Sequence, residues 1–139
     1  MALSLFVDSS MFYAAADRGD RSNGRAKKVL SSGERLVTSD HVLVETWLLL
    51  AHRLGRSAAE RFWEALRAGA AATEPVVAAD LEVAFAIGVD FADQNFSIVD
   101  RASFAVMQRI GVFRAATLDE HFAIFRFGRR RDRAFELVR

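Results

Sequence analysis

The chain has 139 residues, 52% of them hydrophobic, with one proline and no cysteine. This composition indicates a folded globular chain and excludes disordered proteins, disulfide-stabilised proteins, thiol enzymes and cysteine-ligated zinc proteins. The 19 basic and 18 acidic residues give a formal net charge of +1, which excludes a polycation that binds nucleic acids through its total charge.

Length and hydropathy suggest the domain organisation and the compartment. The length suits one domain, which we expect to cover residues 1–139. No apolar run approaches the roughly 20 residues that span a bilayer, and the N-terminus lacks the basic segment of a signal peptide. We therefore expect a cytoplasmic protein that does not enter a membrane.

The first half of the chain alternates short apolar runs with helical patterns. A nearly continuous apolar run at 3–7 is typical of a buried parallel strand. Polar residues at 19–24, and glycines at 33 and 55, interrupt the helical patterns. The expected elements are, in chain order, strand 3–7, helix 11–17, helix 25–32, strand 35–39 and helix 41–54.

The second half continues this alternation. Ser57 with Glu60, and Ser97 with Asp100, form capping-box patterns that each open a helix. The expected elements are the helix from Ser57, strand 75–78, helix 79–90, the helix from Ser97 to Gly111, strand 112–117 and two short β segments around a basic turn in 125–139. This order predicts a three-layer α/β/α sandwich with a mostly parallel central sheet.

Asp8 directly follows the first expected strand. Open α/β sheets bind their ligands at the carboxyl ends of their strands, so this position is a candidate ligand site. An aspartate there can also cap the helix that follows. Since Ser9 and Ser10 could each provide the cap, both interpretations of Asp8 remain open.

Glu45 is the strongest anomaly in the sequence. The helix at 41–54 is apolar on nearly every side, which predicts that it is buried. Glu45 lies in its middle with no Lys or Arg three or four residues away, and His41 is its nearest local partner. A buried carboxylate without a counterion needs a distant arginine, a proton or a metal ion.

Two more acids lie in the apolar stretch 91–122. The capping box from Ser97 accounts for Asp100 by itself. Thr117 and Glu120 form another capping-box pattern, which leaves Asp119 without a structural role. Asp119 therefore resembles Asp8, because both follow a strand.

Four acids on such a sheet can converge on one edge. Without a cation, some of these like charges would have to take up protons. Oxygen ligands without His or Cys favour Mg²⁺ or Mn²⁺ over zinc. A site of this kind suits metal-assisted attack of water on a phosphodiester.

Four segments resemble the acidic blocks of PIN-domain ribonucleases, and most closely those of VapC-type toxins. They are VDSS at 7–10, VLVET at 42–46, DQNFSIVDRASFAVM at 93–107 and TLDEHF at 117–122. The resemblance covers nearly the whole chain, in the same order and with compatible spacing. It implies that four acids are catalytic and bind the metal: Asp8, Glu45, Asp100 and Asp119. It further implies Asp93 as an auxiliary acid and Thr117 as a supporting residue that orients a carboxylate or water.

The resemblance also implies an activity and partners. The implied protein is a Mg²⁺-dependent endoribonuclease, with Mn²⁺ able to substitute, that acts as the toxin of a toxin–antitoxin pair. It forms a homodimer and is inhibited by a small antitoxin, for which we expect a groove near Met11, Phe12 and Trp47. The neighbouring His121 is expected to pack or to form hydrogen bonds beside the site.

The C-terminal segment is rich in arginine. Arg126, Arg129, Arg130 and Arg131, together with Arg133, are candidates for contacts with RNA phosphates. The alternative is a solvated hairpin turn, and the two interpretations remain open.

Three other functions fit parts of the pattern. A PIN nuclease of RNA processing without an antitoxin would carry the same acids. A non-catalytic RNA-binding module would not need Glu45 in an apolar helix. A phospho-acceptor receiver domain would need a late lysine, and the chain has none after Lys28.

Overall fold

The strands of the computed structural model, which describes residues 3–139, all belong to one sheet. The order across the sheet is β3-β2-β1-β4-β5, and every pairing is parallel. The strands are β1 (Ser4–Val7), β2 (Arg35–Ser39), β3 (Ala72–Glu74), β4 (Arg114–Ala116) and β5 (Glu136–Val138). The predicted parallel sheet is therefore confirmed.

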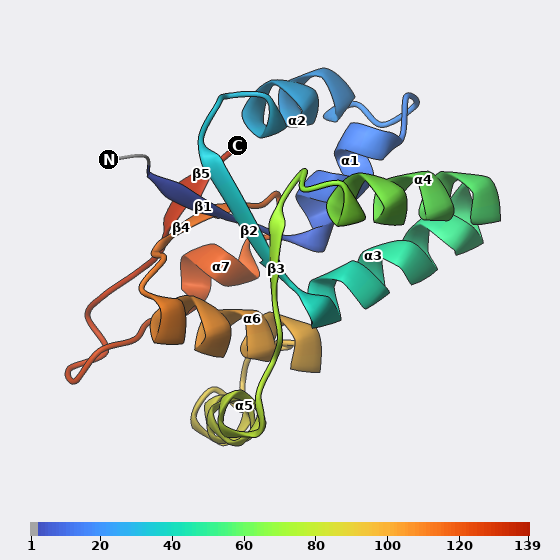
Figure 1. The fold of residues 1–139 in the computed structure, drawn as a ribbon. Coiled ribbons are helices and arrows are strands. Elements are labelled where there is room, and N and C mark those ends of the chain that lie inside the picture. Colours follow the sequence, from blue (N-terminus) through green and yellow to red (C-terminus); the bar gives the residue numbers. More distant parts are fainter. Residues whose placement is uncertain (1–2) are drawn as a thin grey trace.

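Helices cover both faces of this sheet, as predicted for a three-layer sandwich. Figure 1 shows α1, α2 and α4 above the sheet and α5, α6 and α7 below it, with α3 extending from its edge. The helices are α1 (Ser9–Ala16), α2 (Asn23–Leu30), α3 (Asp40–Arg53), α4 (Arg56–Arg67), α5 (Ala78–Asp90), α6 (Ile98–Ile110) and α7 (His121–Ile124). Within residues 3–139, none of these helices combines the length and apolarity needed to cross a membrane.

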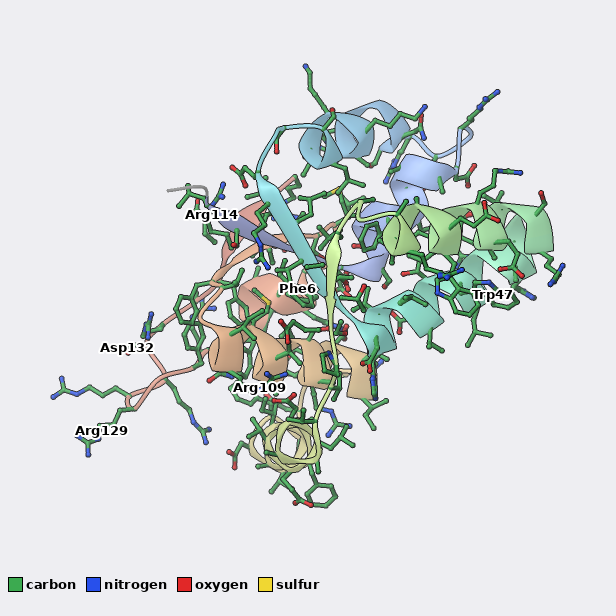
Figure 2. The ribbon with its side chains drawn as sticks, viewed as in Figure 1. Phe6, Trp47, Arg109, Arg114, Arg129 and Asp132 are labelled. Carbon is green, nitrogen blue, oxygen red and sulfur yellow. The ribbon has the colours of Figure 1, made fainter. Side chains whose placement is uncertain are left out.

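The core lies around the central strand and the aromatic face of α6. Phe6 of β1 is fully buried at the centre of the molecule (Figure 2). Phe104 of α6 stacks on Phe125 with ring centroids 4.4 Å apart and meets Phe96 and Phe122 edge-on. Buried aromatic pairs of this kind add to the stabilisation from area burial. The packing holds α6 against the sheet and so fixes the position of its first turn.

The third strand and the start of the fourth helix differ from the prediction. The third strand is Ala72–Glu74 and ends before Pro75, which has no N–H to donate to a strand ladder. The fourth helix begins at Arg56 after Gly55, whose φ of 100° favours glycine. The Ser57 hydroxyl accepts a hydrogen bond from Arg61 instead of capping the helix. The predicted capping box at Ser57 is therefore wrong.

The prediction that α3 is buried on nearly every side is also wrong. Val42, Thr46 and Leu50 are buried, but Val44 and Leu48 are 55% and 58% exposed. The helix packs against α1, α4 and α6 and leaves its remaining face open. An apolar sequence pattern on all sides of a helix therefore does not distinguish a helix buried in the core from a helix with one apolar face exposed to solvent.

The C-terminal segment contains less β structure than predicted. Its second part forms β5, which extends the main sheet beside β4. The predicted β pairing around the basic turn is reduced to a single antiparallel bridge between Phe127 and Arg133. The turn includes Gly128 and Arg131, both at positive φ.

Candidate active site

A cavity of about 390 Å³ opens at the carboxyl edge of the sheet and gathers all four predicted acids. Asp8 comes from the end of β1, Glu45 from α3, Asp100 from the first turn of α6, and Asp119 from the segment after β4. The lining residues are Asp8, Ser9, Ser10, Tyr13, Asp20, Glu45, Leu49, Arg53, Ser97, Asp100, Leu118 and Asp119. Residues far apart in the chain thus meet in one place.

Asp8 is both a helix cap and a member of the acidic site. Its Oδ2 accepts hydrogen bonds from the Ser10 hydroxyl at 2.9 Å and the Thr117 hydroxyl at 3.0 Å, and from the Ser10 N–H at 3.4 Å. The side chain is nearly fully buried. Burial raises the pKa of Asp8 to about 6, the hydrogen bond from Ser10 opposes this shift, and the charge of Asp100 adds to it.

Asp100 likewise has two roles. Its Oδ2 accepts the Ser97 N–H at 3.2 Å, while the Ser97 hydroxyl accepts the Asp100 N–H at 3.0 Å, so the predicted capping box is present. The same oxygen lies 2.8 Å from Nδ1 of His121. Burial raises the pKa of Asp100, the hydrogen bond to His121 opposes the shift, and nearby Asp119 reinforces it.

Glu45 reaches the cavity from α3 and is half-buried, which corrects the prediction of a fully buried side chain. Its Oε1 accepts a hydrogen bond from the Ser9 hydroxyl at 2.5 Å. Desolvation raises the pKa of Glu45, and the negative charges of Asp100 and Asp119 contribute in the same direction. No Lys or Arg within the described chain forms an ion pair with it.

Thr117 links Asp8 to the segment that carries Asp119. Its buried hydroxyl donates to Asp8 and accepts the Asp119 N–H at 3.0 Å. The predicted capping box of Thr117 and Glu120 is therefore wrong, because α7 begins later, at His121, whose N–H bonds to Asp119 Oδ1 at 2.9 Å. The orienting role expected of Thr117 agrees with these contacts.

The donor set fits a divalent cation. One ligand atom each from Asp100, Asp119 and His121 lie within 4.8 Å of one another. Among residues 3–139, neither aspartate pairs with Lys or Arg; His121 is their only partner in an ion pair. Converging carboxylates with unsatisfied negative charge are the ligands that hard divalent cations prefer. The hydrogen bond of His121 confirms the contact predicted for it.

Asp93 is not brought to this cavity. It is exposed in the turn between α5 and α6 and does not line the cavity, whereas Asp100, seven positions later, does. The turn keeps Asp93 on the outer surface, so we do not include it among the metal ligands.

The arginines of the C-terminal segment lie away from the acids. Arg126 donates to backbone carbonyls at the end of α7, and Arg131 bonds to Asp90 at 2.6 Å. Arg129 extends from the turn on the side of the molecule opposite to α3 (Figure 2). Arg130 is exposed on the same turn. Contacts between these residues and RNA remain a prediction.

Several lining residues escaped prediction. Ser9 and Ser10 follow Asp8 directly, and the sequence indicates them only as possible helix caps. Ser10 also accepts the Leu118 N–H at 2.9 Å, which ties α1 to the segment after β4. Asp20 and Arg53 reach the cavity from a polar loop and a helix end, where the sequence shows no distinctive pattern.

Comparisons with known proteins agree with this geometry. The family model of the PIN domain matches residues 5–128. The 23S rRNA-specific endonuclease VapC20 of Mycobacterium tuberculosis is 39% identical over 121 residues, which cover 86% of this chain and 92% of that protein. Ribonuclease VapC26 of the same organism is 29% identical over 124 residues, covering 88% and 92%.

Solved structures give the same result. The crystal structure of VapC20 from M. tuberculosis, described as a toxin that cleaves the sarcin–ricin loop, matches with a TM-score of 0.80 and 36% identity over 86% of this chain and 92% of that one. VapBC2 from Rickettsia felis, bound to a DNA fragment from its promoter, matches with a TM-score of 0.68 but 9% identity, over 98% of both chains. The second match supports the fold alone. The chain therefore belongs to the PIN-domain family, with homologues among the VapC endonucleases.

Proposed function

We propose that this protein is a Mg²⁺-dependent endoribonuclease that acts as the toxin of a toxin–antitoxin pair. One observation carries the proposal: four acids share a cavity, three have raised pKa values, and none pairs with Lys or Arg among the described residues. Such a cavity stores negative charge that a divalent cation would neutralise. Mn²⁺ has the same preference for oxygen ligands and is expected to substitute.

In this proposal the acids and their neighbours have different parts. Asp8, Asp100, Asp119 and Glu45 would hold the cation, which supplies activation of water and stabilisation of charge on the phosphate. Ser9, Ser10 and Thr117 orient the carboxylates through the hydrogen bonds described above. His121 already bonds to Asp100, so it positions that carboxylate and does not stand free as a general base.

The relatives suggest the RNA that is cleaved. VapC20 is named as specific for 23S rRNA and as cleaving the sarcin–ricin loop, and it shares 39% identity with this chain over most of both lengths. We infer that ribosomal RNA is the substrate class, and that this loop is the first sequence to test. Such a substrate agrees with a cytoplasmic location.

The test is incubation of purified protein with intact ribosomes, with total RNA, and with a synthetic sarcin–ricin hairpin. We expect new 5′ ends with Mg²⁺ or Mn²⁺ and none with EDTA. An Asp100→Asn protein prepared in parallel controls for contaminating nucleases. Cleavage that persists with EDTA or in Asp100→Asn would contradict the proposal. Cleavage of other RNAs but not of the hairpin or the ribosome would reject only the substrate.

The antitoxin is expected in an apolar groove of about 370 Å³ between α1, α2 and α4. Phe12 and Phe62 line it, in edge-to-face contact at 5.1 Å. Met11 is buried in the core and Trp47 does not line this groove, so only Phe12 of the three predicted residues belongs to it. The alternative is a PIN nuclease that has no antitoxin. In that case no small neighbouring gene would encode a protein that binds this groove and shields its side chains from chemical labelling.

A homodimer is supported by uncovered apolar side chains. Val44 and Leu48 of α3 are more than half exposed, as are Phe85 and Val89 of α5. Clustered exposed apolar groups on a folded chain mark contact surfaces. Light scattering of Leu48→Glu and Phe85→Glu proteins tests this assignment: we expect monomers, and a retained dimer would place the interface elsewhere.

A further inference from the structure

A second cavity, of about 560 Å³, lies beside the acidic one and is lined mainly by arginines. Arg21 lies in the turn before α2, Arg25 lies in the first turn of α2, and Arg139 follows β5. Ser22 and Leu118 complete the lining. Leu118 lines both cavities, so the basic and the acidic cavity are neighbours across one side chain.

The basic cavity carries excess positive charge. Arg21 and Arg25 are exposed, and within residues 3–139 neither forms an ion pair with a carboxylate. The side chain of Arg25 lies 3.4 Å from the Ser22 hydroxyl. Arg139 bonds to Glu120 at 2.6 Å, a pair that is largely exposed to solvent. Two guanidinium groups are therefore free to bind an anion.

The turn before α2 joins the two cavities. Asp20 lines the acidic cavity, and the next residue, Arg21, lines the basic one. The Asp20 carboxylate accepts the Ser22 N–H at 2.7 Å, and its backbone carbonyl accepts the Asn23 N–H at 2.9 Å. Asn23 in turn donates to the carbonyls of Ala14 and Ala15 at the end of α1. These bonds hold the arginines at a fixed place next to the acids.

We propose that the basic cavity binds a phosphate of the RNA strand adjacent to the phosphodiester that is cleaved. The proposal rests on the ribonuclease function proposed above. Guanidinium groups bind phosphate oxygens through paired, charge-assisted hydrogen bonds. An acidic cavity alone repels a polyanion, so cations at its rim are needed to hold the strand near it.

The arginines of the C-terminal turn are less suited to this task. Arg131 is bonded to Asp90, and Arg133 lies over the rings of Phe113 and Phe127 at 4.7 and 4.9 Å. Arg129 points away from the molecule on the side opposite to α3 (Figure 2). Position, in addition to charge, therefore favours the cavity of Arg21 and Arg25.

The test measures binding of a short fluorescent single-stranded RNA as a function of salt. It uses Asp8→Asn protein, so that the RNA is not cut. We expect Arg21→Gln/Arg25→Gln to weaken binding about 10-fold and to reduce the slope of log K against log salt by about 1 to 2. Lys27→Gln/Lys28→Gln is the matched control, because it removes two exposed charges from α2 outside this cavity. Its slope should fall by less than half as much.

Two results would overturn the proposal: an unchanged slope in Arg21→Gln/Arg25→Gln, or an equal loss in the lysine control. Arg129→Gln/Arg130→Gln, measured alongside, would identify the C-terminal turn if that pair alone reduces the slope. Wild-type protein that binds RNA through Arg21 and Arg25 but cuts none would reject the nuclease function and keep the phosphate site. If instead the wild-type protein cuts RNA, and Arg21→Gln/Arg25→Gln leaves the salt dependence of binding unchanged, the nuclease function stands and the phosphate site is rejected.

Discussion

Asp80 and Asp100 occupy the same position in two helices that pack together, yet their surroundings differ. Each lies in the first turn, is buried, and accepts the N–H of the residue before its helix, Val77 or Ser97. Arg109, which lies between α5 and α6 in Figure 2, binds Asp80 at 3.0 Å, whereas Asp100 faces Asp119 and His121.

The two pKa values shift in opposite directions. Burial raises the pKa of Asp80, but hydrogen bonds from Arg109 and Val77 outweigh it and the net pKa is lowered. At Asp100 burial prevails and the pKa is raised. A buried acid with its own arginine is structural, whereas a buried acid among other acids needs a proton or a cation to balance its charge. The following predictions test this contrast, from the largest effect to the smallest.

RNA cleavage should separate the two aspartates most clearly. We expect Asp100→Asn to lower the cleavage rate at least about 100-fold, because one ligand of the charge-stabilising site is lost. Asp80→Asn should leave the rate per folded molecule unchanged. Single-turnover cleavage at saturating Mg²⁺, normalised to folded protein by circular dichroism, measures both. Equal losses of cleavage rate in the two variants would show that Asp100 has no role in catalysis that Asp80 lacks.

The metal-free protein should lose stability as the pH rises through the acidic range. The pKa of Asp8 is about 6 when folded and 3.8 in a model peptide, so the folded state binds the proton more tightly. The free energy of unfolding therefore falls between about pH 4 and pH 6, by about 3 kcal/mol from Asp8 alone. Urea titrations in EDTA measure it. Asp8→Asn should flatten the dependence of the unfolding free energy on pH. An unaltered dependence would show that Asp8 is not the group with the raised pKa.

Substitution of the two aspartates should change stability with opposite signs. Asp80→Asn breaks a buried pair, but Arg109 is 35% exposed, so we expect a loss of about 2 kcal/mol, less than for a fully buried pair. Asp100→Asn removes a repelled charge and should stabilise the metal-free protein at pH 8. Denaturant midpoints in EDTA report both changes. A loss in Asp100→Asn as large as that in Asp80→Asn would contradict the pKa directions.

Metal binding should reverse part of the instability of the acidic site. At ten times its Kd, Mg²⁺ stabilises a single site by about 1.4 kcal/mol. Thermal unfolding at pH 7.5 with Mg²⁺ and with EDTA measures the gain. Asp80→Asn should retain the gain and Asp100→Asn should lose it, while Ca²⁺ and ionic-strength controls separate binding from screening.

The fold was largely predictable because apolar runs and caps are local signals. The strand at 35–39 and the helix from Ser97 to Gly111 follow directly from such signals. The strand near Pro75 and the helix near Ser57 were misplaced because a turn residue can end one element or begin the next.

The candidate site was predictable only in its acids. The position within the helix does not separate Asp80 from Asp100, and the arginine that neutralises Asp80 lies 29 residues away from it in the sequence. Likewise, the apolar pattern of α3 did not reveal which face has no neighbour. Asp20, Arg21 and Arg25 acquire their roles only when the turn before α2 is placed against the segment after β4.

The hydroxyl of Thr117 donates its one proton to Asp8, and its oxygen accepts a hydrogen bond from the Asp119 N–H. Two of the four acids are therefore in place once β1 and β4 lie side by side, before any ion or RNA arrives. In a nuclease assembled in this way, folding alone brings these two carboxylates together. Restraint of the proposed activity would have to come from another molecule, such as the antitoxin expected in the groove between α1, α2 and α4. The interval between synthesis and capture would be the time in which the cell is exposed to that activity.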